Sequence, residues 1–391
     1  MYDLLIKNGR VIDHSQGLDA ILDIGINGSK INKIEKNISE RSEKNIFNAT
    51  GMVVSAGLID MHCHIIEGTE KFSIHPDSAG VNQGVTTVVD GGSVGLNQYN
   101  MFQNKISSTI KSKVYSFINL SSVGQIIPYD LINWSDIDKK GINEVISNNL
   151  DFIKGIKIRL IGDLIAKSGV EIIKLAIDIA AIHNLPIMVH IGESQRIVPS
   201  NIIQKIIQLL RKNDIISHVY TAKQGGLIDL NGFIFPELKD AKERGVALDV
   251  AFGKSNCSFR VARQMIEQGI FPDIISSDLS ADSIEDISFG LPMTLSKFIA
   301  LGFSLGETLQ MVTANPSTIL KLHNKTGRLV PGMSADISIL KEEFGNWSLE
   351  DGAHEIIRSK SIYIPVASVV SGELNIASPI KYRHLDSLDL V

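Results

Sequence analysis

Apolar, β-branched runs alternate with amphipathic helical patterns through the central part of the chain. Eight such runs are separated by stretches that can mostly hold helices, and they are residues 57–64, 86–92, 114–122, 155–160, 186–193, 216–221, 247–253 and 273–280. Near-continuous Val/Ile strands separated by helices are typical of a parallel sheet covered by helices on both faces. Eight such units over about 270 residues have the size of a (β/α)₈ TIM-like barrel, so we predict an α/β fold of this kind.

An open, doubly wound sheet is the alternative arrangement of such units. It would need a glycine-rich phosphate-binding turn after an early strand, and DGGSVGLNQ (90–98) only approximates one. The two ends of the chain, 1–55 and 325–391, are rich in short β-like stretches and turns, with hairpin dipeptides at Asn8-Gly9 and Asn27-Gly28. We therefore expect both ends to form one small β-sandwich, with the barrel (56–324) inserted between them.

The composition of the chain excludes several classes of protein. Of 391 residues, 44% are hydrophobic and 21% charged, which is ordinary for a globular enzyme, and a net charge of −5 offers no basic surface for nucleic acid. No apolar run approaches the roughly 18–20 residues that a membrane span needs. Two cysteines cannot form a disulfide framework, and no export signal is visible. We expect a cytoplasmic protein that acts on a small molecule.

The stretch GLIDMHCHI (57–65) ends an apolar run with two histidines one residue apart. In a strand, His62 and His64 point to the same face, and a divalent metal is the usual link between two such imidazoles. Alone, this pair would as readily be two surface or singly hydrogen-bonded histidines. The residues at the ends of the other predicted strands must decide between the two interpretations.

Further metal-binding residue types fall at the carboxyl ends of the predicted strands, where the chemistry of a parallel barrel gathers. They are His190, His218 and Asp278. Each could be an ordinary core or loop residue, but together with the His62–His64 pair they favour a metal site. Lys157 lies on a neighbouring strand. A desolvated lysine can add CO₂ to become a carbamate that bridges two metals, although an interior lysine paired to an acid is the alternative. Lys154, at the entry of the same strand, is the weaker candidate.

With these residues in view, the chain resembles the amidohydrolase superfamily over nearly its whole length. The motifs that carry the resemblance are GLIDMHCH, GIKIR, VHIGE, SHVYT, SSDLS and the tail TANPSTILKLHNKTGRLVPGMSADISIL. The resemblance implies that His62, His64 and Asp278 hold one divalent metal and that His190 and His218 hold a second. Lys157, as a carbamate, would bridge the two ions, for which zinc is the default in imidazole-rich sites.

Within this superfamily, PDSAGVNQGVTTVVDGGSVG (76–95) is similar to an amidohydrolase/deacetylase subgroup close to dihydroorotases and hydantoinases. The resemblance implies a metal-dependent hydrolase that cleaves an amide or ester of a small acylated acid, by deacetylation. Ring opening by a cyclic amidohydrolase is a second possibility, and a non-enzymatic scaffold is a third. Dihydroorotases place an arginine two residues after the second histidine, where this chain has Ile66. Retention of the ligand set argues against a scaffold.

The remaining expectations concern single roles in catalysis and assembly. Asp278 would take the proton from the attacking water and deliver it to the leaving group, as a general base and acid. Arg159, two residues after Lys157, could bind a substrate carboxylate or pair internally with an acid such as Glu193. The resemblance also suggests a homo-oligomer.

Overall fold

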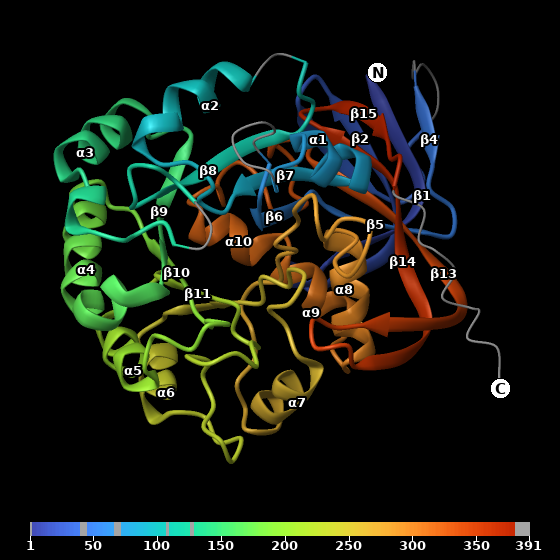
Figure 1. Ribbon diagram of the computed structural model, residues 1–391. Coiled ribbons are helices and arrows are strands. Elements are labelled where there is room, and N and C mark those ends of the chain that lie inside the picture. The colour runs from blue at the N-terminus through green and yellow to red at the C-terminus, as the bar shows by residue number, and fades with distance from the viewer. Residues whose placement is uncertain (1, 40–44, 66–71, 107–108, 126–128, 380–391) are drawn as a thin grey trace.

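The architecture is taken from a computed structural model of the chain (Figure 1). It describes residues 2–39, 45–65, 72–106, 109–125 and 129–379. Among these residues, none of the helices combines the length and the apolar character that crossing a membrane requires.

Seven strands form a parallel sheet in which each strand pairs with the next one along the chain. They are β6 (Leu58–Cys63), β7 (Val85–Asp90), β8 (Lys113–Asn119), β9 (Ile153–Arg159), β10 (Ile187–His190), β11 (Ile215–Ser217) and β12 (Ala247–Asp249). Their apolar side chains are buried on both faces of the sheet, as expected for a parallel sheet with helices outside it. In β9, Ile156 and Ile158 share one buried cluster with helix residues, so Lys157 and Arg159 face the other side.

The eighth predicted strand, 273–280, does not form a regular strand. Its backbone nevertheless lies between the two outer strands, because isolated parallel bridges join Ile274 to Asp249 and Leu279 to Cys63. The Asp278 amide also donates to the carbonyl of His62 at 2.7 Å. The positive φ of Asp278 (48°) turns the chain out of an extended conformation and interrupts the ladder. The parallel sheet is therefore curled, with an irregular segment between its outer strands.

Helices connect the parallel strands and cover the outside of the curled sheet (Figure 1). They are α1 (Pro76–Ala79), α2 (Tyr99–Lys105), α3 (Lys139–Asn148), α4 (Gly162–Ile182), α5 (Ser200–Leu209), α6 (Pro236–Glu243), α7 (Phe259–Glu267), α8 (Leu291–Ala300), α9 (Leu305–Met311) and α10 (Ala314–Ile319). Short 3₁₀ turns are His14–Gln16, Val81–Gln83, Leu96–Gln98 and Trp134–Asp136. The buried faces of α4 and α5 carry isoleucines at helical spacing.

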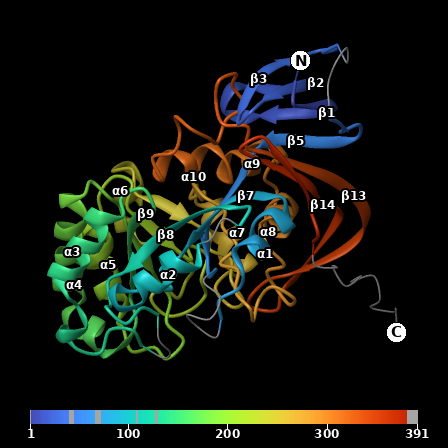
Figure 2. The ribbon, with the colours of Figure 1, turned by 90° about the horizontal axis from the view of Figure 1, so that it is seen from above.

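Both ends of the chain contribute strands to a second, mostly antiparallel sheet in the order β15-β14-β13-β5-β1-β2-β3, with β4 beside β1. The strands are β1 (Leu4–Asp13), β2 (Leu18–Asn27), β3 (Lys30–Glu35), β4 (Ile46–Asn48), β5 (Met52–Ala56), β13 (Ile337–Glu350), β14 (Ile356–Val370) and β15 (Glu373–Ile376). Figure 2 shows this sheet on one side of the molecule, away from α3 to α5. The division into two domains, at the boundaries given above, stays a prediction.

Only one of the two predicted hairpin dipeptides is a hairpin. Asn27 and Gly28 connect β2 to β3, as expected. The prediction at Asn8-Gly9 is wrong, because β1 continues through it with a register shift between Ile6 and Gly9. Asn8 adopts a φ of 61°, and its amide donates to Asp23 Oδ1 at 2.8 Å, so the dipeptide forms a bulge.

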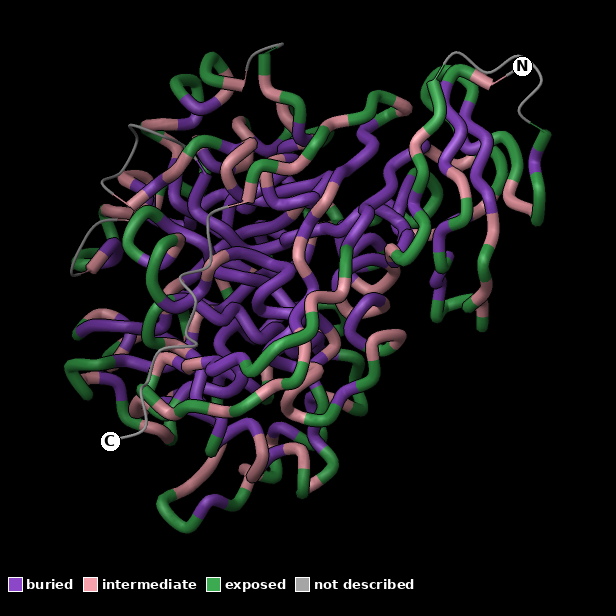
Figure 3. The backbone as a smooth tube through the Cα atoms, turned by 90° about the vertical axis from the view of Figure 1, so that its right-hand side faces the viewer, coloured by how far each residue is buried: buried purple, intermediate pink, exposed green. Residues whose placement is uncertain are grey.

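The second sheet packs against the parallel sheet through polar as well as apolar contacts. Ser338 on β13 donates to the carbonyl of Gly84 at 2.6 Å and accepts from the Leu58 amide at 2.9 Å. Lys113 forms an ion pair with Asp336 at 2.6 Å. Figure 3 shows the buried residues in the interior of the molecule. The contact of Leu58 with Ser338 holds the start of β6 against the second sheet.

Candidate metal centre

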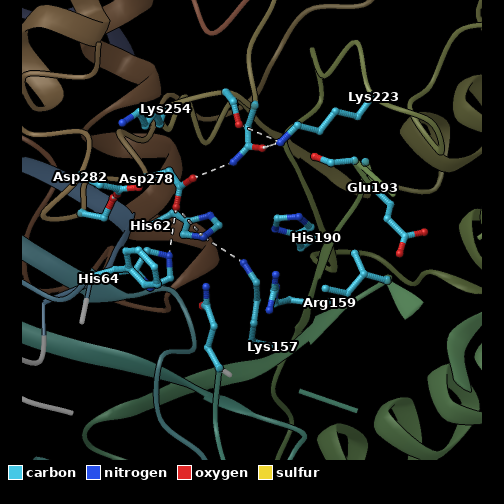
Figure 4. A pocket seen from close by; sticks show the side chains of 18 of the residues that line it. His62, His64, Lys157, Arg159, His190, Glu193, Lys223, Lys254, Asp278 and Asp282 are labelled. Carbon is cyan, nitrogen blue, oxygen red and sulfur yellow. Dashed lines mark hydrogen bonds and ion pairs between the residues drawn. The ribbon is translucent and has the colours of Figure 1, made fainter. Parts of the chain in front are cut away.

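The six residues predicted to bind metal come together at one end of the curled sheet. His62 is the second-last residue of β6 and His64 directly follows that strand. Lys157 lies on β9, His190 ends β10, His218 follows β11 and Asp278 lies in the irregular segment. Five of them are buried, and His190 is half-buried. Five of the six line one cavity of about 340 Å³. His218 does not line it and instead contacts His190. Figure 4 shows how the side chains of the five cavity-lining residues converge.

His62, His64 and Asp278 form a compact cluster. One potential ligand atom from each lies within 4.8 Å of the others. Asp278 Oδ1 is 3.2 Å from His64 Nε2 and 3.5 Å from His62 Nε2. Burial alone would raise the pKa of Asp278, but the neighbouring histidines lower it below its usual value, so the carboxylate is ionised. Two imidazoles and one carboxylate at this spacing fit a divalent ion such as zinc.

Lys157 is the lysine that reaches this cluster. Its Nζ is 2.9 Å from His62 Nε2 and 3.5 Å from Met188 Sδ. Burial lowers the pKa of Lys157 to about 8, so a larger fraction of the side chain is the neutral amine near neutral pH than in an exposed lysine. Lys154 instead lies over the ring of Tyr115, 4.8 Å from its centroid. The structure therefore places Lys157, and not Lys154, beside the histidines.

His190 and His218 form a second pair on the other side of Lys157. His218 Nε2 lies 2.7 Å from His190 Nδ1, and the His218 ring centroid is 5.4 Å from that of His62. Burial lowers the pKa of His218 to about 3 and the pKa of His190 well below its usual value. Both imidazoles are therefore neutral, which is the form that binds a metal. His218 Nδ1 is 2.8 Å from the carbonyl of Ala251, so Nδ1 carries the proton.

A second layer of polar residues orients the histidines of the first cluster, and the sequence analysis missed it. Asp249 Oδ2 is 3.3 Å from His62 Nδ1. Ser93 Oγ is 2.8 Å from His64 Nδ1 and donates to Asp90 at 2.7 Å. Hydrogen bonds of this kind fix which imidazole nitrogen faces a metal. The only available signal was that both aspartates lie within predicted strands; the structure shows that they end β7 and β12.

Gly91 and Gly92, in the turn that only approximates a phosphate loop, leave room for the site. A Cβ on Gly91 would lie 2.2 Å from His62 Cδ2, and one on Gly92 would lie 2.3 Å from Lys157 Cβ. Gly92 also has a φ of 95°, a conformation that L side chains rarely adopt. These glycines serve close packing around His62 and Lys157.

Backbone strain gathers at the same end of the sheet. His218, Ala251 and Asp278 have φ values of 68°, 42° and 48°. Such conformations cost free energy in residues with a side chain, and they persist where surrounding structure holds them, often at functional sites. Here they aim Asp278 into the cavity and His218 toward His190, and they free the Ala251 carbonyl to accept from His218.

Arg159 also lines the cavity, and it forms an internal ion pair, which was one of the two alternatives considered for it. Its partner is Asp130, at 3.1 Å, and not Glu193 as suggested from the sequence. Glu193 accepts backbone hydrogen bonds from Gly162, Ile197 and Val198. A role of Arg159 in binding substrate stays a prediction. Ile66, which argued against a dihydroorotase, lies outside the described residues.

Comparison with known proteins agrees with this fold. Residues 53–372 match the Amidohydrolase family. The chain belongs to this family. The resemblance drawn from the sequence motifs is therefore confirmed, and the chain is a hydrolase of the amidohydrolase superfamily.

Several amidohydrolases are similar to this chain over almost their full length. A deacetylase of Brucella anthropi is 30% identical over 383 residues, covering 96% of this chain and 93% of that protein. A deacetylase of Enterococcus faecalis is 29% identical over 379 residues, covering 95% of this chain and 99% of that protein. The crystal structure of a dihydroorotase superposes with a TM-score of 0.86 at 28% identity, covering 97% of this chain and 99% of that one.

Proposed function

We propose that this amidohydrolase removes an acyl group, an acetyl group in the first instance, from a small acylated acid. The observation that carries the proposal is the buried His62–His64–Asp278 cluster at a small cavity, with Lys157 in contact with His62. A second histidine pair lies nearby, since the ring centroids of His62 and His218 are 5.4 Å apart. The full-length similarity to proteins named deacetylases supports the choice of reaction. The cavity volume, about 340 Å³, suits a ligand of small size.

The cofactors that we propose are two divalent ions, zinc by default, held by these histidines and Asp278. Lys157, as a carbamate, would supply the anionic group between them. The geometry that supports this role is the position of Nζ, 2.9 Å from His62 Nε2 and on the side that faces the second pair. When bound, such ions supply Lewis acidity that activates water and polarises a carbonyl.

The residues of the chain would then divide the work of hydrolysis. Asp278 is ionised and lines the cavity, so it would take the proton of the attacking water and return it to the leaving amine or alkoxide. Asp249 and Ser93 hold His62 and His64 in one orientation during this step. The buried walls exclude bulk water and strengthen the electrostatic interactions.

A second candidate function is ring opening by a cyclic amidohydrolase. It is favoured by the similarity to dihydroorotases, one of which, from Streptococcus thermophilus, is 45% identical over 89 residues, 22% of this chain. Ile66 weighs against it. We also propose the closed (β/α)₈ barrel as the fold, which the bridges of the irregular segment to β6 and β12 support. The homo-oligomer and the cytoplasmic location remain predictions.

The experiment that tests the function is a hydrolysis panel on metal-reconstituted protein. Acetylated hydroxy acids and acetylated amino acids are compared with hydantoin, dihydropyrimidine and dihydroorotate. Elemental analysis of the same samples is expected to find about two divalent ions per chain. Preferential turnover of a cyclic substrate would replace the first function by the second, and the absence of stoichiometric metal would remove the basis of both.

A further inference from the structure

A second cavity, of about 160 Å³, lies between α8 and the far part of β13. Among the described residues, none lines both this cavity and the one at the candidate metal centre. α8 is fixed beside β14 (Figure 1), because the Tyr363 amide donates to Ser296 Oγ at 2.9 Å. The apolar walls of the cavity are Ile287, Phe289, Met293, Trp347 and Leu349. Since an apolar cavity of about 150 Å³ can hold one benzene molecule, this one has room for a ligand with a single small ring.

Lys297 is a buried amine in the wall of this cavity, and the proposed hydrolysis does not use it. The residue is only 2% exposed. Its Nζ donates to the carbonyl of Ile287 and lies 4.0 Å from the centroid of the Phe252 ring. Burial lowers the pKa of Lys297 to about 7, although neighbouring anionic groups such as Asp351 raise it. A large fraction of the side chain is therefore the neutral amine near neutral pH, and a desolvated amine of this kind is a nucleophile toward carbonyl compounds.

Ser348 lines the same cavity and carries a polar group that lacks a partner. The residue is 2% exposed, and within the described part of the chain its buried Oγ has no hydrogen-bond partner. A buried hydroxyl without a partner costs free energy, and such a group calls for an explanation. An oxygen atom of a bound ligand would accept its hydrogen bond and remove this cost.

Acidic side chains surround the more exposed side of the cavity. Glu285 and Asp286 are exposed and Glu350 is half-buried. Asp286 pairs with Lys254 at 3.6 Å. Acidic residues at an entrance repel anions, so the charge of this one disfavours ligands that carry a carboxylate or phosphate. The volume, the apolar walls and the charge together favour a small neutral molecule.

We propose that this cavity captures small neutral aldehydes and that Lys297 binds them covalently as an imine. The Ser348 hydroxyl donates to the carbonyl oxygen of the entering aldehyde. The lone pair of the amine attacks the carbonyl carbon to form a carbinolamine. Loss of the former carbonyl oxygen, together with the two amine hydrogens, as water then leaves a C=N bond, with no oxidation or reduction. The apolar walls exclude the water that would reverse the last step. The site lies apart from the metal centre and does not depend on the function proposed for it.

Reductive trapping in the full-length, metal-loaded protein tests this proposal. Benzaldehyde is the probe, and sodium cyanoborohydride reduces its imine to a stable benzylamine. Peptide mapping by mass spectrometry should find one benzyl group per chain, on Lys297. Lys154 provides the matched control, because burial also lowers its pKa and it lies over the Tyr115 ring, yet it is not among the residues that line this cavity. The label should be lost in Lys297→Met and unchanged in Lys154→Met.

Three further measurements keep Lys297 in place. Ser348→Ala should slow labelling by about 2- to 10-fold, as expected for the loss of one neutral hydrogen bond. 4-Carboxybenzaldehyde should label Lys297 much more slowly than benzaldehyde, because its negative charge meets the acidic entrance. Toluene, which fits the cavity but has no carbonyl group, should slow the labelling by benzaldehyde.

Other outcomes would overturn the proposal. Benzyl groups spread over exposed lysines, without preference for Lys297, would show only the general reactivity of amines. Equal labelling of Lys297 in folded and urea-unfolded protein, or labelling that toluene does not slow, would show that the cavity is not used. Unchanged labelling in Ser348→Ala would refute the hydrogen bond assigned to its hydroxyl. If Lys297→Met does not fold, the peptide map and the toluene competition on the wild type decide the question.

Discussion

Replacing Asp249 by asparagine should weaken metal binding although residue 249 is not a predicted ligand. The two carboxylate oxygens have separate tasks. Oδ2 faces His62 Nδ1 at 3.3 Å and accepts from Ser217 Oγ at 3.3 Å, whereas Oδ1 accepts from Ser276 Oγ at 2.6 Å and from the Ala251 amide at 3.3 Å. An amide can replace only one oxygen, so its NH₂ group must face donors at one end.

Either orientation of the new amide disturbs the site. If the NH₂ group faces His62, it favours the tautomer that is protonated at Nε2, the atom that points to Lys157 and Asp278. If it faces Ser276 and Ala251, it leaves the buried amide of Ala251 without an acceptor, next to the carbonyl that holds His218. Changes in such outer hydrogen bonds typically cost 10- to 100-fold in metal affinity, or about 1.4–2.8 kcal/mol.

The assay is a competition titration with a chromogenic chelator on metal-depleted protein. Asp130→Asn is the matched control, because Asp130 is also a buried carboxylate but pairs with Arg159 and contacts no histidine. Circular dichroism confirms that both variants are folded. A metal affinity in Asp249→Asn equal to that of wild type and Asp130→Asn would refute the role given to Asp249.

Three further predictions follow from single side chains. Lys157→Ala should lose both activity and metal, with partial rescue by short carboxylic acids, while Lys154→Ala keeps both. The reverse pattern in activity and elemental analysis would show that Lys154, and not Lys157, has the proposed role. Asp278→Asn should lower kcat by about 10²–10⁴-fold with much of the metal retained, since asparagine tolerates the positive φ but cannot accept the proton; near-normal turnover would exclude Asp278 as the base. Burial lowers the pKa of Lys297 to about 7 from 10.5, so between these pH values the unfolded chain binds more protons than the folded chain. The free energy of unfolding should therefore rise by up to about 1.4 kcal/mol per pH unit from pH 7 upward. Lys297→Met should flatten this rise in denaturant titrations, and an unchanged slope would contradict the prediction.

The strand-end residues could be predicted from the sequence because strand periodicity and strand ends are local properties. The order of strands in a parallel sheet then brings His62, Lys157 and His190 to one end without further information. Asp278 was found for the same reason, although its segment is irregular. The positive φ there comes from packing between β6 and β12, which no local pattern records.

Contacts between loops could not be predicted in this way. One of the two roles considered for Arg159 was an ion pair with an acid such as Glu193. Its partner in the structure is Asp130, which comes from a loop whose path the strand pattern does not determine. Lys223 and Asn256 are likewise 33 residues apart and meet only through the folded backbone. The bulge at Asn8 follows from Asp23 on the paired strand, while the dipeptide alone is typical of a turn.

The position of β5 in the second sheet has a consequence for how the chain is made. β5 is flanked by β1, which the ribosome has already released, and by β13, which begins only at Ile337. While residues 57–336 emerge, the growing polypeptide carries a half-built sheet whose edge at Met52–Ala56 has no neighbour on one side. An open edge of this kind readily pairs with other chains. Translation that stalls before residue 337 therefore leaves an aggregation-prone product, and only the last seventh or so of the sequence covers this edge.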